Sequence, residues 1–255
     1  MNLECRVELA SAYRAAPQIA RVVSEDWCSR ELYCAACASR HLLSSRANTP
    51  AVDFVCPRCG QSFQLKSLKT WNRTKIVDAG YDSMVRAIRS DRVPNLLIMQ
   101  YSPDWMVRNL ILVHGAFFAE TAIEKRPALS DKARRAGWVG CNILLDRIPE
   151  DGKIAVVSDG VAAPERQVRH AFSRAGKIAA VPPPVRGWTL DVLIAIRKLE
   201  RRSFSLQELY QQQPYLERIH ANNRHIRAKI RQQLQVLRDL GLITFAGAGN
   251  YVLRV

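Results

Sequence analysis

Two sets of residues able to do chemistry overlap between Tyr33 and Ser67. The first set consists of two C-x-x-C pairs separated by 18 residues. The pairs are formed by Cys34, Cys37, Cys56 and Cys59. Four thiolates at this spacing complete a tetrahedral zinc shell and leave no open position for a substrate. We therefore expect a structural zinc site within residues 33–60.

The second set is Asp53, Gln64 and Lys66. A strand aspartate followed by acid-x-Lys is typical of Mg²⁺-dependent nucleases, in which carboxylates hold the metal and the lysine positions or deprotonates the attacking water. Asp53, Gln64 and the Leu65 carbonyl would be the Mg²⁺ ligands, with Glu25 as a further candidate. Gln64 stands where a carboxylate is usual and adds no charge to the site. Such triples also arise by chance, so a plain surface strand remains the simpler interpretation of these residues alone.

The elements that must position these side chains are two short strands, at 51–55 and 62–68. Alternation along a strand places Asp53 on one face of the first, and Gln64 and Lys66 on one face of the second. Adjacent strands would bring the three together at one rim. The second cysteine pair lies between the strands, so we expect zinc to fix the register of this hairpin.

The remainder of residues 1–180 predicts a mixed α/β domain with one central sheet. Asp78 is expected to cap a helix that runs to Ser90. The other expected elements are helices at 3–32 and 164–174 and strands at 95–101, 109–113 and 153–158.

Residues 124–142 are expected to form a basic loop. It carries Lys125, Arg126, Lys132, Arg134 and Arg135, followed by Gly137-Trp138-Val139-Gly140. Cations beside an aromatic ring suit phosphate contact combined with stacking on a base. The alternative is a solvated loop whose tryptophan plugs the core, and the sequence leaves both interpretations open.

A proline-rich, extended linker is expected at 181–187, because Pro182, Pro183 and Pro184 follow one another. Beyond it, residues 188–255 predict a helix at 188–199, a capping box at Ser205–Glu208, a helix at 222–240 ended by Gly241, and a glycine-turn hairpin. Three helices followed by a hairpin predict a winged helix-turn-helix domain.

The third of these helices is expected to contact DNA. Arg224, Arg227 and Arg231 would form a stripe away from its apolar face. Asn222, Asn223 and His225 lie at its start, the end that enters the major groove in helix-turn-helix proteins. Asparagine can read adenine and arginine can read guanine. The alternative is a solvated face in which one asparagine caps the helix.

The composition supports a polyanionic partner. Lys and Arg number 38 against 23 Asp and Glu, a formal net charge of +15, and cations placed on phosphates release condensed counterions. No apolar run is long enough to span a membrane, and the N-terminus lacks the pattern of a signal peptide. A cytoplasmic protein that makes no membrane contact is expected. Disulfides are not expected there, so Cys5, Cys28 and Cys141 should be buried apolar residues.

Taken together, these residues resemble the DpnI (Dam-replacing) family of restriction endonucleases, which cut DNA carrying N6-methyladenine. The resemblance extends over nearly the whole chain. It is carried by 24–27, the four cysteines, 52–54, 65–67, the run from Ala133 to Asn142, and the run from His225 to Asp239.

The resemblance implies a PD-(D/E)xK nuclease domain with an inserted zinc site, joined to a winged-helix domain, with methylated 5′-GATC recognised by both. Asp53 and Lys66 match the family's catalytic positions. Gln64 departs from the family's glutamate, although Mrr-like PD-(D/E)xK nucleases use glutamine there. Arg134, Arg135 and Trp138 match as well, and we hypothesise that Trp138 senses the adenine methyl group by apolar contact.

The leading interpretation is a monomeric, Mg²⁺-dependent, methyl-directed (type IIM) endonuclease acting on double-stranded DNA. The first alternative is a non-cleaving reader of methylated DNA whose nuclease site is weakened at Gln64. The second is a zinc-ribbon transcription regulator with a winged helix. Lys66 favours the enzyme, since a reader has no need of it.

Overall fold

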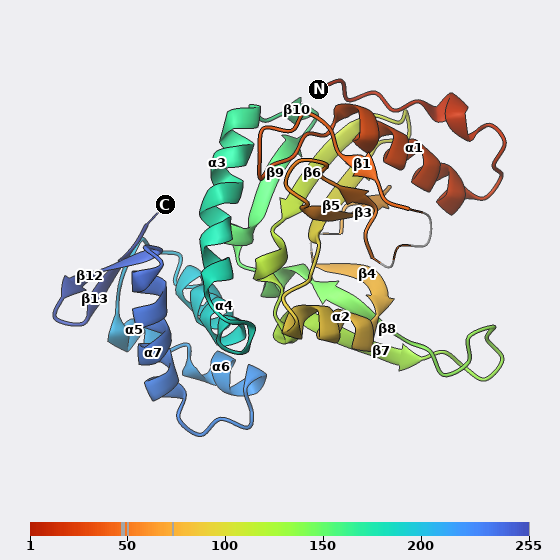
Figure 1. The fold of residues 1–255 in the computed structure, drawn as a ribbon. Coiled ribbons are helices and arrows are strands. Elements are labelled where there is room, and N and C mark those ends of the chain that lie inside the picture. The colour runs from red at the N-terminus through yellow and green to blue at the C-terminus, as the bar shows by residue number, and fades with distance from the viewer. Residues whose placement is uncertain (47–48, 50, 73, 255) are drawn as a thin grey trace. The chain divides into compact units, whose positions relative to one another are not determined.

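The computed structural model describes residues 1–46, 49, 51–72 and 74–254. Contacts divide the chain into two compact units, each assembled from separate segments. The first contains Met1–Arg73, Val93–Gly115 and Glu150–Gly176. The second contains Thr74–Arg92, Ala116–Pro149 and Lys177–Val255. Helices and strands alternate along the chain (Figure 1), so the predicted mixed α/β class is confirmed.

The first unit is built on a seven-stranded sheet with the order β1-β2-β3-β5-β6-β9-β10. Neighbouring strands are antiparallel except β3 and β5, which are parallel. Leu96, Leu97, Ile98 and Met99 of β5 are all at most 2% exposed, so the central strand is covered on both faces. The strands are β1 (Leu43–Ser44), β2 (Phe54–Val55), β3 (Ser62–Leu68), β5 (Asn95–Tyr101), β6 (Val107–Val113), β9 (Lys153–Ser158) and β10 (Val161–Ala162).

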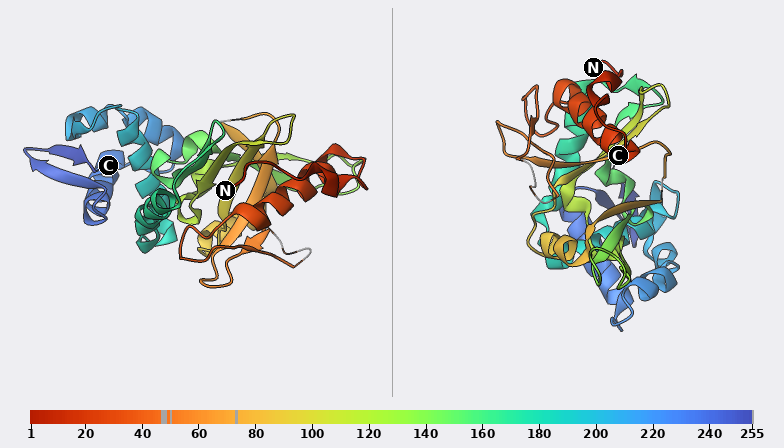
Figure 2. Two further views of the ribbon diagram at one scale, coloured as in Figure 1. Left: turned by 90° about the horizontal axis from the view of Figure 1, so that it is seen from above. Right: turned by 90° about the vertical axis from the view of Figure 1, so that its right-hand side faces the viewer.

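Two helices of this unit pack beside the sheet, α1 (Ala16–Glu31) near β3 and α3 (Glu165–Ala175) near β9 (Figure 2). The single helix predicted over 3–32 is wrong in its first part, where a 3₁₀ turn at Val7–Ala10 precedes α1. Pro17 explains the new start, because proline is accommodated in the first helical turn and not in a helix interior. Trp27 is fully buried, and its indole N–H donates to the Asn2 carbonyl at 2.9 Å.

The second unit contains a three-stranded antiparallel sheet with the order β4-β8-β7. Its elements are β4 (Lys75–Gly80), β7 (Ile123–Ala128), β8 (Val139–Leu144) and α2 (Tyr81–Arg89). Contrary to the prediction, Asp78 does not cap α2. It lies buried in β4, and Gly80 is the N-cap residue. Pairing of β4 with β8 therefore outweighs the local capping preference of aspartate.

The basic segment 124–142 is likewise not one loop, because its two ends pair as β7 and β8. Ile123, Cys141 and Ile143 are buried, whereas the charged residues of β7 that follow Ile123 are half-buried or exposed. Only the residues between these strands, 129–138, form the connecting loop.

The prediction of an extended linker at 181–187 is wrong, because α4 runs from Pro183 to Arg197 and residues 183–187 are helical. The proline ring suits the first turn of a helix, where its missing N–H would have no intrahelical partner. Arg186 fixes this turn: it is 4% exposed and donates to both carboxylate oxygens of Asp91. The domain limits 1–180 and 188–255 stay predictions.

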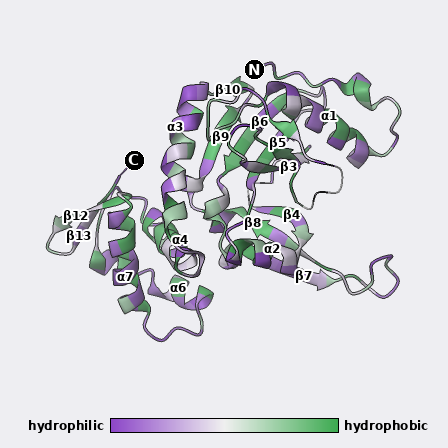
Figure 3. Cartoon of the chain, viewed as in Figure 1, coloured by the Kyte–Doolittle hydropathy of each residue, from purple (hydrophilic) through white to green (hydrophobic). Residues whose placement is uncertain are grey.

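The C-terminal elements form helices followed by a small sheet (Figure 3), with the strand order β11-β13-β12. The predicted capping box is confirmed at Ser205 and Glu208, and Gly241 ends α7 with a φ of 71°. After α4 come β11 (Ser203–Ser205), α5 (Leu206–Tyr210), α6 (Gln213–Ile219), α7 (Ile226–Asp239), β12 (Ile243–Gly247) and β13 (Asn250–Leu253). Within the described residues, no helix is long and apolar enough to cross a membrane.

Candidate functional site

The four paired cysteines lie close enough together to share one metal ion. All four sulfurs lie within 4.8 Å of one another, and the Cys34–Cys59 and Cys37–Cys56 Sγ pairs are each 3.6 Å apart. Zn–S bonds of about 2.3 Å place the vertices of a tetrahedron roughly 3.8 Å apart. The backbone N–H groups of Ala36 and Ser39 also donate to Cys34 and Cys37 Sγ at 3.4 Å. The cluster is therefore compatible with structural zinc.

The backbone around Cys56 prepares it to be a thiolate. Burial acts to raise its pKa, but hydrogen bonds from the N–H groups of Cys59 and Arg58 outweigh that effect and lower the pKa of Cys56 to about 6. Burial raises the pKa of Cys34. Because the thiolate is the form that binds a metal, Cys56 offers an ionised ligand at neutral pH.

Asp53 is held against strand β3. In the antiparallel β2–β3 pair, Phe54 lies opposite Phe63 and Val55 opposite Ser62. The Asp53 N–H donates to the Phe63 carbonyl at 2.9 Å, so Asp53 and its neighbour Phe54 both lie beside Phe63 where this pairing ends. Asp53 Oδ2 accepts the Leu65 N–H at 2.7 Å. The Asp53 carboxylate thus accepts a hydrogen bond that a backbone carbonyl would accept if strand β2 were longer.

The predicted strand at 51–55 is shorter than expected, because β2 begins only at Phe54. Ala51 has a φ of 56°, in the left-handed region, so the chain turns there and cannot extend the strand. Because strand β2 is short, the Leu65 N–H donates its hydrogen bond to the Asp53 side chain.

Gln64 and Lys66 lie on one face of strand β3, because residues two apart on a strand point the same way. Gln64 is 7% exposed and Lys66 is half-buried. The structure therefore places Gln64 and Lys66 together on β3 and ties the Asp53 carboxylate to the backbone of Leu65 between them.

Helix α1 places a charged side chain near Asp53. Arg21 Nε donates to Glu25 Oε1 at 2.8 Å. The pKa of Arg21 is raised mainly by this hydrogen bond and by the Glu25 charge, with a smaller contribution from Asp53. Arg21 thus lies in electrostatic range of Asp53. The sequence gives no signal for Arg21, because its nearness follows from the packing of α1 beside β3.

The Trp138 side chain, in the second unit, is neither buried in a core nor fully exposed to solvent. The half-buried ring lies over Gly140, where an added Cβ would come within 2.9 Å of Trp138 Cη2 and Cζ3. At Gly80 a Cβ would lie 3.5 Å from Nε1. Backbone bonds between Leu129 and Trp138 and between Gly137 and Leu129 close the loop, whose Arg134 and Arg135 are exposed. Gly80 and Gly140 have no Cβ, so the indole ring can pack closely against the backbone at both positions.

The predicted recognition residues divide at the start of α7. Asn222, Asn223, Arg224 and His225 precede the helix, so the helical stripe predicted to begin at Arg224 is wrong at that position. Asn223 Oδ1 accepts the His225 N–H at 2.8 Å, a local turn before the helix. Asn222, Arg224 and His225 are exposed.

Arg227 and Arg231 do lie on α7 and are tied to neighbouring helices. Arg227 Nε donates to Gln213 Oε1 at 2.9 Å, and its guanidinium lies 5.0 Å from the Tyr210 ring centre. Arg231 Nη1 donates to the Tyr210 hydroxyl at 2.8 Å. Both arginines remain exposed while holding fixed orientations.

Two family models match the sequence. One, described as the Dam-replacing family, matches residues 1–180, and the other, described as the Dam-replacing HTH domain, matches residues 184–252. The first implies a nuclease related to methyl-dependent restriction endonucleases, and the second implies DNA as a partner. The two matches leave only a few residues of the chain uncovered, and this protein belongs to the Dam-replacing (DpnI) family.

Proposed function

We propose that the protein is a Mg²⁺-dependent endonuclease that hydrolyses double-stranded DNA at 5′-GATC sites containing N6-methyladenine. The observation that carries this proposal is the hydrogen bond from the Leu65 N–H to Asp53 Oδ2, which fixes an ionisable carboxylate beside Gln64 and Lys66. Asp53 and Lys66 match the aspartate and lysine of a PD-(D/E)xK nuclease, with Gln64 in place of the second acid, and we propose that fold for the nuclease domain.

Each of these groups has a distinct task in hydrolysis. Asp53, the Gln64 side-chain oxygen and the Leu65 carbonyl would hold Mg²⁺, whose ligands are oxygens. When bound, the ion stabilises the negative charge that develops on the phosphate. Lys66 positions water for attack on the phosphorus. The Leu65 N–H keeps Asp53 oriented before DNA arrives, which reduces the entropy lost on reaching the reactive geometry.

The four cysteines would hold a structural Zn²⁺ ion inside the hairpin that carries Asp53 and β3. Cys56 and Cys59 lie between Val55 and Ser62, the innermost pair of β2 and β3. An ion bound there would fix the pairing of β2 with β3, beside which Asp53 accepts the Leu65 N–H. Zinc therefore supports the active site without taking part in the reaction.

DNA would be bound by the basic loop and by the winged-helix elements. Arg134 and Arg135 are exposed in the loop, and Asn222, Arg224 and His225 are exposed before α7. The net charge of +15 favours a polyanion. Asn223, Arg227 and Arg231 complete the proposed set, and we propose that the protein acts as a monomer.

Trp138→Ala should reduce the preference for methylated over unmethylated GATC by about fivefold, because one methyl contact contributes about 1 kcal/mol. The indole is seated on Gly80 and Gly140 and offers an apolar surface in a basic loop. Cleavage rates on matched methylated and unmethylated duplexes measure the effect. Trp138→Phe is the control, because it retains an apolar ring. An unchanged preference in Trp138→Ala would show that the methyl group is read elsewhere.

A second candidate function, a non-cleaving reader of methylated DNA, is favoured by Gln64 itself. This residue is neutral and 7% exposed, so the site has one carboxylate fewer than the family pattern. Gln64→Glu separates the two candidates. For an enzyme, the added charge should lower the Mg²⁺ concentration at half-maximal cleavage by about tenfold. If only the variant cuts DNA, the natural chain is a reader.

Plasmids with and without GATC methylation test the proposal as a whole. Incubation with Mg²⁺ should linearise or fragment the methylated plasmid and leave the unmethylated one intact. Absence of cutting, with a mobility shift for methylated DNA only, would support the reader. Equal cutting of both plasmids would refute methyl direction.

A further inference from the structure

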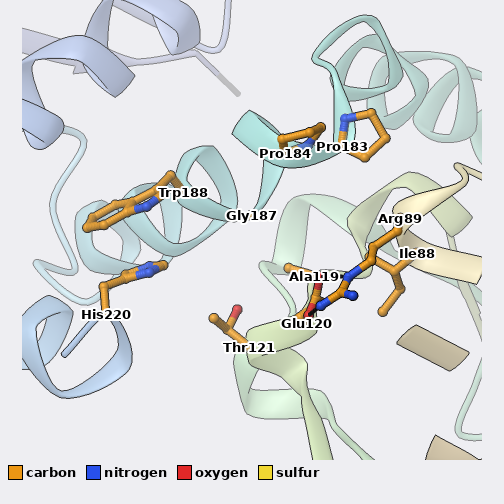
Figure 4. A pocket seen from close by; sticks show the side chains of 10 residues that line it. All are labelled: Ile88, Arg89, Ala119, Glu120, Thr121, Pro183, Pro184, Gly187, Trp188 and His220. Carbon is orange, nitrogen blue, oxygen red and sulfur yellow. Dashed lines mark hydrogen bonds and ion pairs between the residues drawn. The ribbon is translucent and has the colours of Figure 1, made fainter. Parts of the chain in front are cut away.

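We infer that the second unit contains a binding site for a small, flat nitrogen heterocycle bearing an amino group. A cavity of about 470 Å³ lies against α4, and this size is within the range of small-molecule sites. Figure 4 shows its walls: Trp188 and His220 on one side, and Arg89, Glu120 and Thr121 on the other. None of the proposed nuclease, zinc or DNA-contacting residues lines this cavity.

A fully buried carboxylate organises one wall. Asp191 is 0% exposed and accepts from Thr121 Oγ1 at 3.1 and 3.2 Å and from His220 Nε2 at 2.8 Å. Thr121 donates its hydrogen to Asp191 and keeps lone pairs for another partner. With Nε2 protonated, neutral His220 has an acceptor at Nδ1. Thr121 and His220 both line the cavity, which therefore presents acceptors.

The aromatic wall is rigid and flat. The Trp188 and His220 rings are stacked, with centroids 3.5 Å apart and planes 12° apart. Because His220 is held by both the indole and Asp191, the direction of Nδ1 is fixed before any ligand binds. Ile88, Ala119, Pro183 and Pro184 add apolar surface. This combination suits a planar ligand with an apolar body and a few polar edges.

The charges around the cavity indicate the polarity of those edges. Arg89 donates through Nε and Nη2 to the two oxygens of Glu120, at 2.7 and 2.8 Å, so its charge is already neutralised. Glu120 is 43% exposed and keeps further lone pairs open. Because Glu120 offsets the charge of Arg89, this pair gives the site no surplus of positive charge, which disfavours phosphate. Acceptors and a carboxylate select a ligand that donates hydrogen bonds, such as an aminopurine.

Calorimetric titration of the full chain with adenosine tests this inference, with purine riboside, which lacks the amino group, as the comparison. Adenosine should bind, and purine riboside should bind at least about tenfold more weakly, because a hydrogen bond to a charged acceptor is lost. Absence of heat at millimolar adenosine, or equal affinity for the two nucleosides, would overturn the inference.

Glu120→Gln and Glu124→Gln form a matched pair of variants. Glu124 also makes a salt bridge, to Lys75, and its side chain is 39% exposed, but it does not line the cavity. Adenosine affinity should fall about tenfold in Glu120→Gln and stay unchanged in Glu124→Gln. Equal affinity in both variants would contradict a role for Glu120 as the acceptor of the ligand's amino group.

The same titration in the presence of a saturating GATC duplex identifies the source of the heterocycle. Displacement of adenosine by the duplex would show that the site takes a base belonging to DNA. Unchanged adenosine binding would show that it takes a free nucleoside. The cavity makes no use of Asp53, Gln64 or Lys66, so failure of the nuclease proposal would leave this site standing.

Discussion

Lys66→Ala should lower the rate of cleavage of methylated GATC DNA by about 10²–10⁴-fold, the usual contribution of a group that handles a proton at the reacting centre. Affinity for the uncut duplex should change by about twofold or less, because one phosphate contact at most is lost. Lys66 lies on β3 two residues from Gln64 and shares its face. Single-turnover cleavage and duplex binding measured on the same preparations separate the two effects.

Lys69→Ala is the matched control, since it removes the same charge from an exposed position just beyond the end of β3. Its cleavage rate should stay within about twofold of the natural protein. Equal losses of cleavage in the two variants would mean that only the summed charge matters, and Lys66 would lose its place in the reaction.

Removal of zinc should abolish activity through folding and not through chemistry. Chelation, or Cys56→Ser, releases the segment between β2 and β3 and with it the register that seats Asp53 on the Leu65 N–H. Zinc bound at comparable four-ligand sites contributes about 10 kcal/mol or more to folding. We expect a large fall in the melting temperature and loss of cleavage, both restored by adding Zn²⁺ to the chelated protein.

Cys5→Ala provides the control for the cysteine substitution. Cys5 is 6% exposed and stands outside the cluster, so its replacement should cost about 1 kcal/mol and leave the zinc content unchanged. Zinc content measured by atomic absorption should be one ion per chain in this variant. Full activity of a zinc-free preparation would refute the structural role of the ion.

The sequence predicted correctly those elements whose limits depend on a local pattern of residues. Strands β3, β5 and β9 match their predicted limits, because each is a short apolar or alternating run bounded by turn residues. The cysteine cluster follows from the two C-x-x-C pairs, whose spacing is itself the signal for a shared metal site. The capping box at Ser205 and Glu208 is equally local.

Features that depend on distant partners were not predictable in this way. Asp78 has the local pattern of a helix cap, yet pairing with β8 keeps it in a strand. Prolines 182–184 suggest an extended segment, yet the Arg186–Asp91 ion pair and buried neighbours stabilise a helix that begins at Pro183. The division of the chain into two discontinuous units, and the nearness of Arg21 to Asp53, arise only on packing.

The candidate site combines a feature set by local sequence with one that depends on distant partners. Gln64 and Lys66 share a face because of strand alternation, which the sequence encodes directly. The placement of Asp53 required the β2–β3 register and the turn at Ala51, which shortens β2 and frees the Leu65 N–H. A strand of the predicted length would have paired that N–H with a carbonyl.

The most direct test of this account is Asp53→Ala assayed beside the natural protein on one methylated GATC duplex, with cleavage and binding measured together. We predict that the natural protein cuts in Mg²⁺, whereas the variant binds with similar affinity and cuts at least about 10³-fold more slowly, a loss of about 4 kcal/mol of transition-state stabilisation. Cleavage by Asp53→Ala at the natural rate would contradict it.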